Sequence, residues 1–248
     1  MLRSLRSLNG SPIQALDERI GSVSDFLFDD QLWTVRYLVA DTGNWLPGRK
    51  VLISPATVGD LRTTDGSLPV SLTKEQIEKS PEIYEDLPVS RQREIELARY
   101  YGWPHYWAGH ATVASAASIA YLPPIKTKPE SEVAKEKTDP HLRSANEVSG
   151  YHIQVMDGEI GHVEDFIAEA DLWTIRYMVV NTRNWLPGKK VLVAPAWIKK
   201  VSWGDKHVQV ELLRQVIEKC PEFNPSEPVN REYEMRLYDY YGRPKYWE

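Results

Sequence analysis

The sequence predicts a mainly β protein made of two small tandem barrels, each followed by a short helical extension. Three observations lead to this fold class. The chain repeats itself at an offset of 140 residues, the first part of each repeat alternates apolar and polar residues, and the last third changes to a helical period. At 248 residues with 42% hydrophobic content, the chain is long enough for two such units.

The repeat aligns residues 2–107 with residues 142–247 without a gap, and nearly half of the aligned positions are identical. Its longest match sets WTVRYLVADTGNWLPGRKVLISPA (33–56) against WTIRYMVVNTRNWLPGKKVLVAPA (173–196). We therefore expect a first unit at 1–107, a linker at 108–141 and a second unit at 142–248. The second half of the linker is rich in Pro, Lys and Glu and holds no aromatic residue, which favours a flexible connection.

Strands are expected in the first 70 residues of each unit. Residues 33–40 alternate in the period of two that is typical of a β-strand, and the apolar run 51–53 follows it. Between them, Pro47 and Gly48 suit the second and third positions of a tight turn. Five or six short strands at this spacing indicate a small barrel or sandwich.

Helices are expected in the last third of each unit. Thr73 and Gln76 have the spacing of a capping box, which Leu213 removes from the second copy. A longer helix is predicted over 91–101 and again over 231–241, each ended by a glycine. We expect one face of this helix to pack on the barrel and the Pro-x-Tyr-Trp sequence that follows to hold the tail in place.

The repeated strings resemble the PRC-barrel family. The resemblance lies in IGSVSDFLFDD (20–30), in WTVRYLVADTGNWLPGRKVLISP (33–55) and in their second copies, and it covers about residues 2–72 and 142–212. A common bacterial extension of that family, S-P-E…R-E-x-E…Y-Y-G-x-P-x-Y-W, resembles the tails. The resemblance implies an SH3-like six-stranded barrel that acts as an interaction module and not as an enzyme.

Three functions are compatible with this resemblance. The first is a non-enzymatic interaction or assembly protein. The second is a peripheral subunit of a membrane electron-transfer complex, because the photosynthetic reaction centre H subunit has a barrel of this family. The third is an adaptor linked to ribosome or RNA maturation, because a ribosome-maturation factor has one too. The chain lacks the membrane helix of the former and the separate N-terminal domain of the latter, so neither role transfers directly.

Composition and charge limit the classes of binding partner and the cellular location that we expect. A net charge of −5, shared by both units, argues against general nucleic-acid binding. The charge-free stretch 100–125 is interrupted by Gly, Pro and His, so we expect a connector and at most peripheral membrane association. The single cysteine, Cys220, requires no oxidising compartment, and we expect a cytoplasmic protein. Protein partners, or self-association of the barrels, remain open.

No cofactor, metal or catalytic constellation is predicted. None of the six histidines recurs at its partner position in the other repeat, although a metal site built by the repeat would be expected twice. Cys220 replaces Ser80, with no histidine nearby in sequence. Asp25 and Asp165 recur before a phenylalanine, and we expect them to hold a turn or to pair with Arg36 and Arg176.

The aromatic residues are the strongest functional signal. Nine Trp and 13 Tyr stand against four Phe, and Trp and Tyr are enriched where an apolar surface meets a partner. One interpretation places half of the repeated aromatic residues in the barrel cores. The other places the turn tryptophans on a protein-contact face with the neighbouring arginines and asparagines. The candidate contact residues are Trp45, Trp185, Arg36, Arg176, Asn44 and Asn184.

Overall fold

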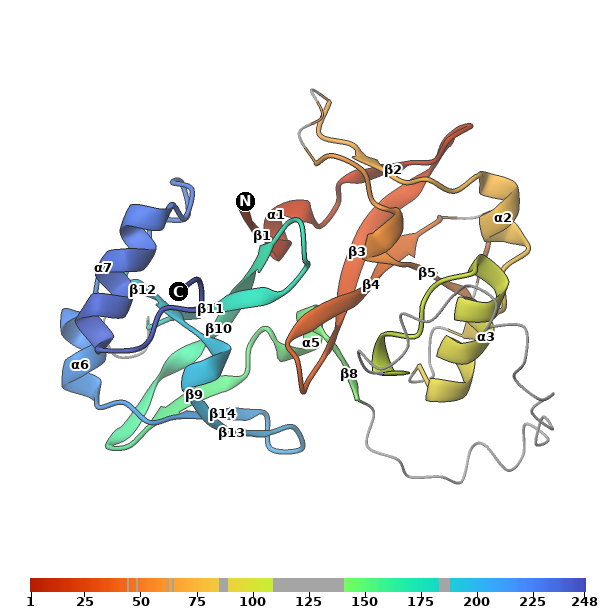
Figure 1. Ribbon diagram of the computed structural model, residues 1–248. Coiled ribbons are helices and arrows are strands. Elements are labelled where there is room, and N and C mark those ends of the chain that lie inside the picture. The colour runs from red at the N-terminus through yellow and green to blue at the C-terminus, as the bar shows by residue number, and fades with distance from the viewer. Residues whose placement is uncertain are drawn as a thin grey trace.

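The structure of the chain is a computed structural model. It describes residues 1–43, 45–47, 49–61, 63, 65–84, 89–108, 141–182 and 188–248. The fold consists of two β-sheets with short helices, and each sheet forms the wall of one unit (Figure 1). The mainly β fold class predicted from the sequence is confirmed. The predicted linker lies almost entirely outside the described residues.

The elements follow the repeat closely. The first unit contributes the strands and helices β1 (Leu2–Ser4), α1 (Leu5–Leu8), β2 (Pro12–Gln14), β3 (Arg19–Asp29), β4 (Thr34–Asp41), β5 (Arg49–Ile53), η1 (Pro55–Thr57), β6 (Leu68–Pro69), α2 (Lys74–Glu78), β7 (Ile83–Tyr84), α3 (Arg91–Tyr101) and η2 (Tyr106–Ala108). The second contributes β8 (Leu142–Ser144), α5 (Ala145–Val148), β9 (His152–Val155), β10 (Gly158–Glu169), β11 (Ile175–Asn181), β12 (Lys190–Val193), η5 (Pro195–Trp197), β13 (Ile198–Ser202), β14 (His207–Val210), α6 (Arg214–Lys219) and α7 (Arg231–Tyr241).

Each sheet has the same central strands. In the first unit the order is β6-β2-β3-β4-β5-β7, and in the second it is β12-β11-β10-β9-β14-β13. The alternation at 33–40 yields β4, which pairs antiparallel with both β3 and β5. Its equivalent β11 pairs in the same way with β10 and β12. The period-two signal therefore marks the middle of each sheet.

The first strand of each repeat belongs to the sheet of the other repeat. Strand β1 pairs antiparallel with β10, from Leu2 opposite Glu169 to Ser4 opposite Ile167. Strand β8 pairs in the same register with β3, from Leu142 opposite Asp29 to Ser144 opposite Leu27. Figure 1 shows β1 beside β10 and β8 beside β3. The two units are thus tied together by a reciprocal strand exchange, which gives each sheet its seventh strand.

Asp25 and Asp165 fasten this exchange. The carboxylate of Asp165 accepts hydrogen bonds from Ser4 Oγ at 2.5 Å and from the Arg6 amide at 2.9 Å. Asp25 accepts the equivalent pair from Ser144 Oγ at 2.5 Å and the Asn146 amide at 3.0 Å. Each aspartate therefore holds the start of a short helix of the other unit. The predicted pairing with Arg36 and Arg176 is wrong, because those arginines are engaged elsewhere.

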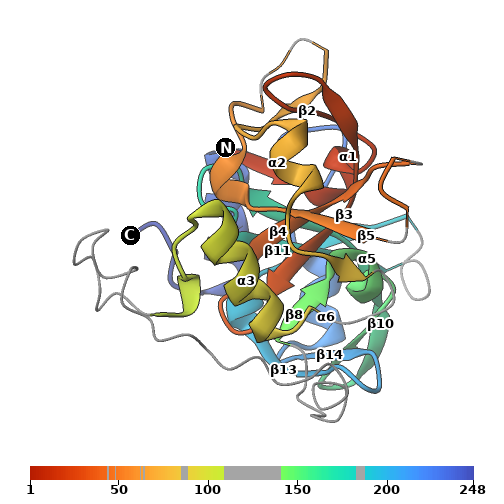
Figure 2. The ribbon, with the colours of Figure 1, turned by 90° about the vertical axis from the view of Figure 1, so that its right-hand side faces the viewer.

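A pseudo-twofold axis passes between β4 and β11. Thr34 and Thr174 occupy the same position in the two repeats and form an antiparallel bridge with each other. On either side, the Val35 amide donates to the Trp173 carbonyl at 2.8 Å, and the Ile175 amide donates to the Trp33 carbonyl at 2.7 Å. These bonds join two equivalent turns face to face, and Figure 2 shows β4 and β11 next to each other.

The junction is apolar as well as hydrogen-bonded. Phe28 lies 5.5 Å from the ring of Phe166, and Phe26 lies 6.2 Å from the ring of Trp173. All four side chains belong to one buried cluster that runs through both units. Leu142, on the exchanged strand β8, is buried in a second cluster of the first unit. The two units consequently share a hydrophobic core instead of resting against each other as separate bodies.

The predicted helices are confirmed. At the start of α2, the Thr73 hydroxyl accepts a hydrogen bond from the backbone amide of Gln76, and the Gln76 side chain accepts one from the backbone amide of Thr73. The residue before α6 is Leu213, which makes no such side-chain bond. Helices α3 and α7 end at Gly102 and Gly242, whose φ angles are +70° and +60°. Across the described parts of the chain, each helix is too short or too polar to cross a bilayer.

Candidate functional site: the Trp45 pocket

Trp45 lies in the turn that follows β4 and closes over the edge of β3. Its indole Nε1 donates to the Ile20 carbonyl at 3.0 Å, which fixes the ring against the strand. The side chain is half-buried, and Lys74 Nζ lies 5.1 Å from the ring centroid. The ring is therefore anchored to the barrel through its N–H group and remains partly exposed, as expected for an aromatic residue at a contact surface.

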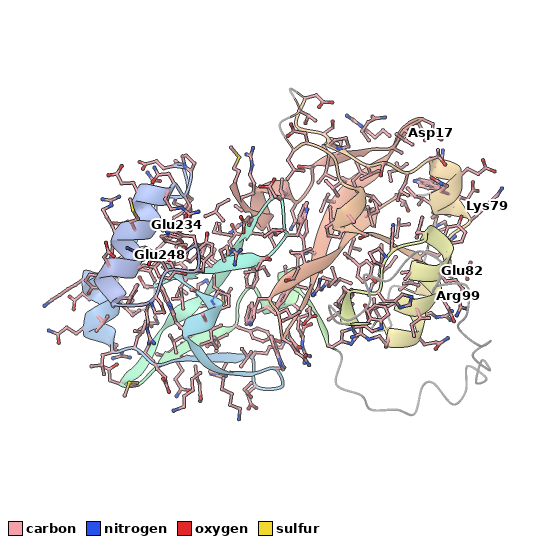
Figure 3. The ribbon with its side chains drawn as sticks, in the orientation of Figure 1. Asp17, Lys79, Glu82, Arg99, Glu234 and Glu248 are labelled. Atoms are coloured by element: carbon pink, nitrogen blue, oxygen red, sulfur yellow. The ribbon has the colours of Figure 1, made fainter. Side chains whose placement is uncertain are left out.

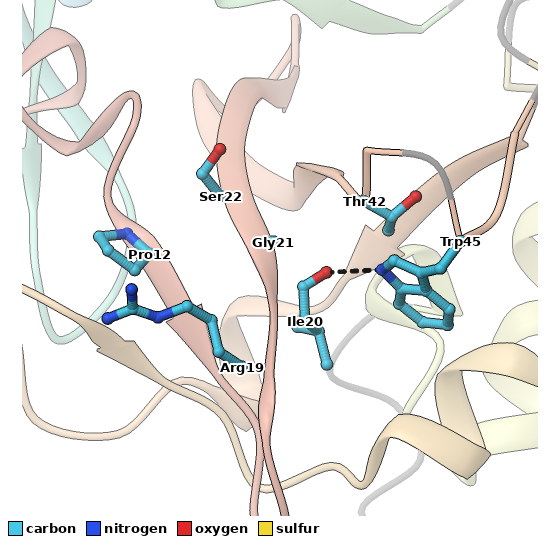
Figure 4. A pocket seen from close by; sticks show the side chains of 7 residues that line it. All are labelled: Pro12, Arg19, Ile20, Gly21, Ser22, Thr42 and Trp45. Carbon is cyan, nitrogen blue, oxygen red and sulfur yellow. Dashed lines mark hydrogen bonds between the residues drawn. The ribbon is translucent and has the colours of Figure 1, made fainter.

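Trp45 forms one wall of an open pocket of about 420 Å³ (Figure 4). This volume lies within the range of sites that hold small ligands or single side chains. We call it the Trp45 pocket, and it is lined by Pro12, Arg19, Ile20, Gly21, Ser22, Thr42 and Trp45.

Gly21 forms the floor of the Trp45 pocket. Its φ angle is +143°, and a Cβ at this position would lie 2.0 Å from the Asp41 carbonyl oxygen. No side chain can therefore occupy the floor without moving β3 away from β4. Figure 4 shows Arg19 and Pro12 on one side of this segment and Thr42 and Trp45 on the other. At Gly21 the pocket is therefore lined by main-chain atoms with no side chain.

Arg19 supplies the charge of the Trp45 pocket. Its side chain is exposed, and it makes no ion pair or hydrogen bond with the described part of the chain. The other nearby cation, Lys74, is paired with Glu18 at 3.2 Å. The acidic groups close by are also engaged: Asp17 accepts from the Lys74 amide at 3.0 Å, and Asp41 accepts from the Gly43 amide at 2.8 Å. Arg19 remains as an unpaired positive charge at the rim.

The predicted arginines lie in a different place. Arg36 pairs with Asp29 at 3.4 Å, and its guanidinium lies 3.9 Å from the centre of the Tyr106 ring. Arg176 pairs with Glu169 at 2.6 Å and lies 4.2 Å from the Tyr246 ring. Both hold the C-terminal tail of their own unit to the sheet, and neither lines the Trp45 pocket. Of the other predicted contact residues, Asn44, Asn184 and Trp185 lie outside the described residues.

The tails contain a repeated buried carboxylate that the sequence analysis did not single out. Glu94 on α3 is fully buried. One of its carboxylate oxygens accepts hydrogen bonds from the hydroxyl groups of Tyr106 at 2.6 Å and Tyr37 at 3.5 Å. His141 Nε2 lies 2.6 Å from its other oxygen. The spacing Arg91-x-x-Glu94, which recurs as Arg231-x-x-Glu234, was the available signal.

The equivalent carboxylate, Glu234 on α7 (Figure 3), has the same tyrosine and arginine partners in the second unit, whereas the histidine contact is made by Glu94. It accepts from Tyr177 Oη at 2.7 Å and Tyr246 Oη at 2.8 Å, and it pairs with Arg231 at 3.0 Å. Each glutamate thus joins a tail tyrosine to a tyrosine of the central strand. The expectation that the tail is held on the barrel is confirmed.

The tyrosines around these glutamates stay protonated. Burial, and then the neighbouring carboxylate, raise the pKa of Tyr37, Tyr106 and Tyr177 far above the ordinary value. The same causes raise the pKa of Tyr246 to about 12. Their hydroxyl groups are therefore permanent donors to the glutamates, and the repeated cluster is a satisfied hydrogen-bond network.

The other titratable candidates do not gather at the Trp45 pocket. Cys220 is buried, and burial raises the pKa of its thiol, which disfavours the reactive thiolate. His152 contacts Glu159 at 2.8 Å and stacks on His207 at 5.3 Å between ring centroids. Within the described ranges, no three His, Cys, Asp or Glu side chains are grouped closely enough to hold a metal ion.

Comparison with known protein families gives one match. The family model of the PRC-barrel domain matches residues 2–77, a segment that includes the Trp45 pocket. The second sheet repeats the architecture of the first, although the family model matches only the first. No curated protein matches the chain.

Proposed function

Because the chain contains a PRC-barrel domain at residues 2–77, we propose that it is a non-enzymatic protein-interaction and assembly module built from two PRC-barrel units. The observation that carries this proposal is the Trp45 pocket, an open site with an aromatic wall and an unpaired cation on the matched domain.

The chemistry of the Trp45 pocket supports protein binding. Trp and Arg are the residues that most often dominate the binding energy of protein interfaces. Trp45 presents a ring already fixed by its bond to Ile20, so little side-chain entropy is lost when a partner covers it. Arg19 adds a charge that selects the partner and speeds its approach.

The strand exchange supports a role in assembly. A shared core and two exchanged strands hold the barrels in one relative orientation. Surfaces on the two units therefore meet partners at a fixed distance and angle, which a flexible pair of domains would not provide. This arrangement suits a protein that positions other proteins.

The buried titratable groups support the non-enzymatic part of the proposal. Glu94 and Glu234 are each bonded to tyrosines and an arginine of their own unit, and they connect the tail to the sheet. Their environment is the one expected of structural groups that stabilise the fold.

Affinity capture tests the proposal. The tagged full-length protein is crosslinked in cells of its source, and the recovered proteins are compared among wild type, Trp45→Ala and Tyr240→Ala. Tyr240 is the control because it is an exposed aromatic residue on α7 that does not line the Trp45 pocket. We expect one stoichiometric partner that Trp45→Ala loses and Tyr240→Ala retains, with both variants folded by circular dichroism. Recovery of no partner, or a partner equally retained by both variants, would contradict the proposal.

A further inference from the structure

The two repeats share the backbone geometry of the Gly21 segment but carry different side chains around it. Ile20, Gly21 and Thr42 recur as Ile160, Gly161 and Thr182. Gly161 has a φ of +148°, and a Cβ there would lie 1.9 Å from the Asn181 carbonyl oxygen, as at Gly21. The backbone at this glycine is therefore alike in the two units, and the side chains beside it distinguish them.

The rim residues differ in charge. Arg19 corresponds to Glu159, Pro12 to His152 and Ser22 to His162. In the second unit the charged residue equivalent to Arg19 has a partner within the unit, because Glu159 contacts His152 Nδ1 at 2.8 Å. In the first unit, Pro12 has no side-chain group that pairs with Arg19, and Arg19 makes no other ion pair in the described chain. Among the described residues, Arg19 is therefore a charge without a partner, whereas Glu159 at the equivalent position has one.

From this contrast we infer that the Trp45 pocket binds an acidic side chain, Asp or Glu, of the partner protein. The inference rests on the proposed interaction function and names the chemistry that the pocket recognises. The carboxylate pairs with the Arg19 guanidinium, which can donate two parallel hydrogen bonds to it. The rest of the side chain lies over Gly21, between Arg19 and the Trp45 wall of the pocket.

Charge complementarity selects this occupant over the alternatives. A basic side chain would meet Arg19 and, beyond the ring, Lys74. A purely apolar side chain would leave the guanidinium partly desolvated without a partner, which costs free energy. An acidic side chain satisfies both the cation and the aromatic wall.

Nuclear magnetic resonance on the full-length protein tests this inference. The probes are acetyl-Gly-Glu-Gly-amide and its glutamine and lysine counterparts, observed through the Gly21 amide and the Trp45 indole N–H. We expect saturable shifts with the glutamate peptide, at a dissociation constant of about 1–10 mM, and binding of the glutamine peptide about 10-fold weaker.

Variants assign the effect to Arg19. Arg19→Gln is expected to weaken binding of the glutamate peptide about 10-fold. Arg19→Glu gives position 19 the negative charge that Glu159 has in the second repeat, and this variant is expected to favour the lysine peptide. Arg99→Gln is the matched control, since Arg99 is an exposed arginine on α3 (Figure 3). Equal shifts with the glutamate and glutamine peptides, no saturable shift, or binding that Arg19→Gln leaves unchanged would each overturn the inference.

The outcome is separable from that of the proposed function. If a captured partner depends on Trp45 but binds Arg19→Gln as tightly as wild type, the interaction function stands and the acidic-side-chain inference fails. If the glutamate peptide binds through Arg19 while capture recovers no partner, the pocket has the stated chemistry and the proposed function fails.

Discussion

At the scale of single residues, Asp25 and Asp165 show how one side chain connects two units. Each sits at the same position of its repeat, accepts the amide of the next phenylalanine at 2.7 Å, and also binds the serine and the short helix that begin the other repeat. These bonds lower the pKa of the carboxyls, but burial outweighs them, so the pKa of both groups lies above its ordinary value.

A pH dependence of stability follows from these raised pKa values. The folded state keeps a proton on each aspartate to higher pH than the unfolded chain does, so the free energy of unfolding falls as pH rises from the ordinary value of 3.8 through the raised value. In Asp25→Asn/Asp165→Asn this contribution is absent.

Urea unfolding of wild type and this double variant at a series of pH values checks the prediction. As the pH rises above the ordinary aspartate pKa of 3.8, we expect wild type to lose stability relative to the variant. Parallel stability curves over that range would show that the two aspartates titrate alike in the folded and unfolded states.

Trp33 and Trp173 are a second residue-scale feature. Their φ angles are +52° and +55°, a region that bulky residues rarely adopt. Trp33 stacks on Phe28 at 5.3 Å, and Trp173 stacks on Phe26 of the other unit. Packing at the junction thus offsets the backbone strain of the two turns, which are the turns that meet at the pseudo-twofold axis.

At the scale of elements, α2 and α6 are the same helix with and without a capping box. Thr73 and Gln76 satisfy each other's amides in α2, whereas Leu213 and Val216 leave the start of α6 without a side-chain acceptor. Both helices still form, because Ile77 and Ile217 are fully buried against their barrels. Tertiary packing therefore decides that the helix exists, and the cap adjusts its stability.

Variants that add the capping box to α6 or remove it from α2 measure its contribution to the free energy of unfolding. Leu213→Thr/Val216→Gln is expected to stabilise the protein by about 1 kcal/mol, and Thr73→Leu to destabilise it by about the same amount. Denaturant unfolding gives both values. A loss of stability in the Leu213→Thr/Val216→Gln variant would instead mean that Leu213 and Val216 contribute packing worth more than a cap.

At the scale of the whole molecule, the strand exchange makes the two repeats one folding unit. Strand β1 completes the sheet of the second repeat and β8 that of the first, while Phe28 and Phe166 meet in the shared core. Neither sheet keeps all of its strands if the other repeat unfolds.

We therefore expect a single cooperative thermal transition. In calorimetry the calorimetric and van't Hoff enthalpies of the full-length protein should agree, and Phe28→Ala should lower the melting temperature of the one transition, with a loss of about 3–5 kcal/mol. Two resolved transitions, or a variant in which only one repeat melts early, would show that the repeats are energetically independent.

Local sequence patterns were enough to predict the repeat, the mainly β class, the positions of the central strands and the ends of the helices. These features depend on local physics: the period of two, the capping residues, and glycines that adopt positive φ at Gly102 and Gly242. The resemblance to the PRC barrel also depended on local strings, and the family match at residues 2–77 agrees with it.

Two features could be seen only in the folded chain: the repeat that each first strand joins, and the residues that gather at the Trp45 pocket. The string Leu-Arg-Ser reads the same at 2–4 and 142–144, and nothing in it distinguishes pairing within a repeat from pairing across repeats. Arg36 is closer to Trp45 in sequence than Arg19 is, yet it contacts Tyr106 of the tail. Arg19, 26 positions before Trp45, lines the Trp45 pocket together with it. Pairing and pocket formation depend on contacts between distant segments, which a local pattern does not encode.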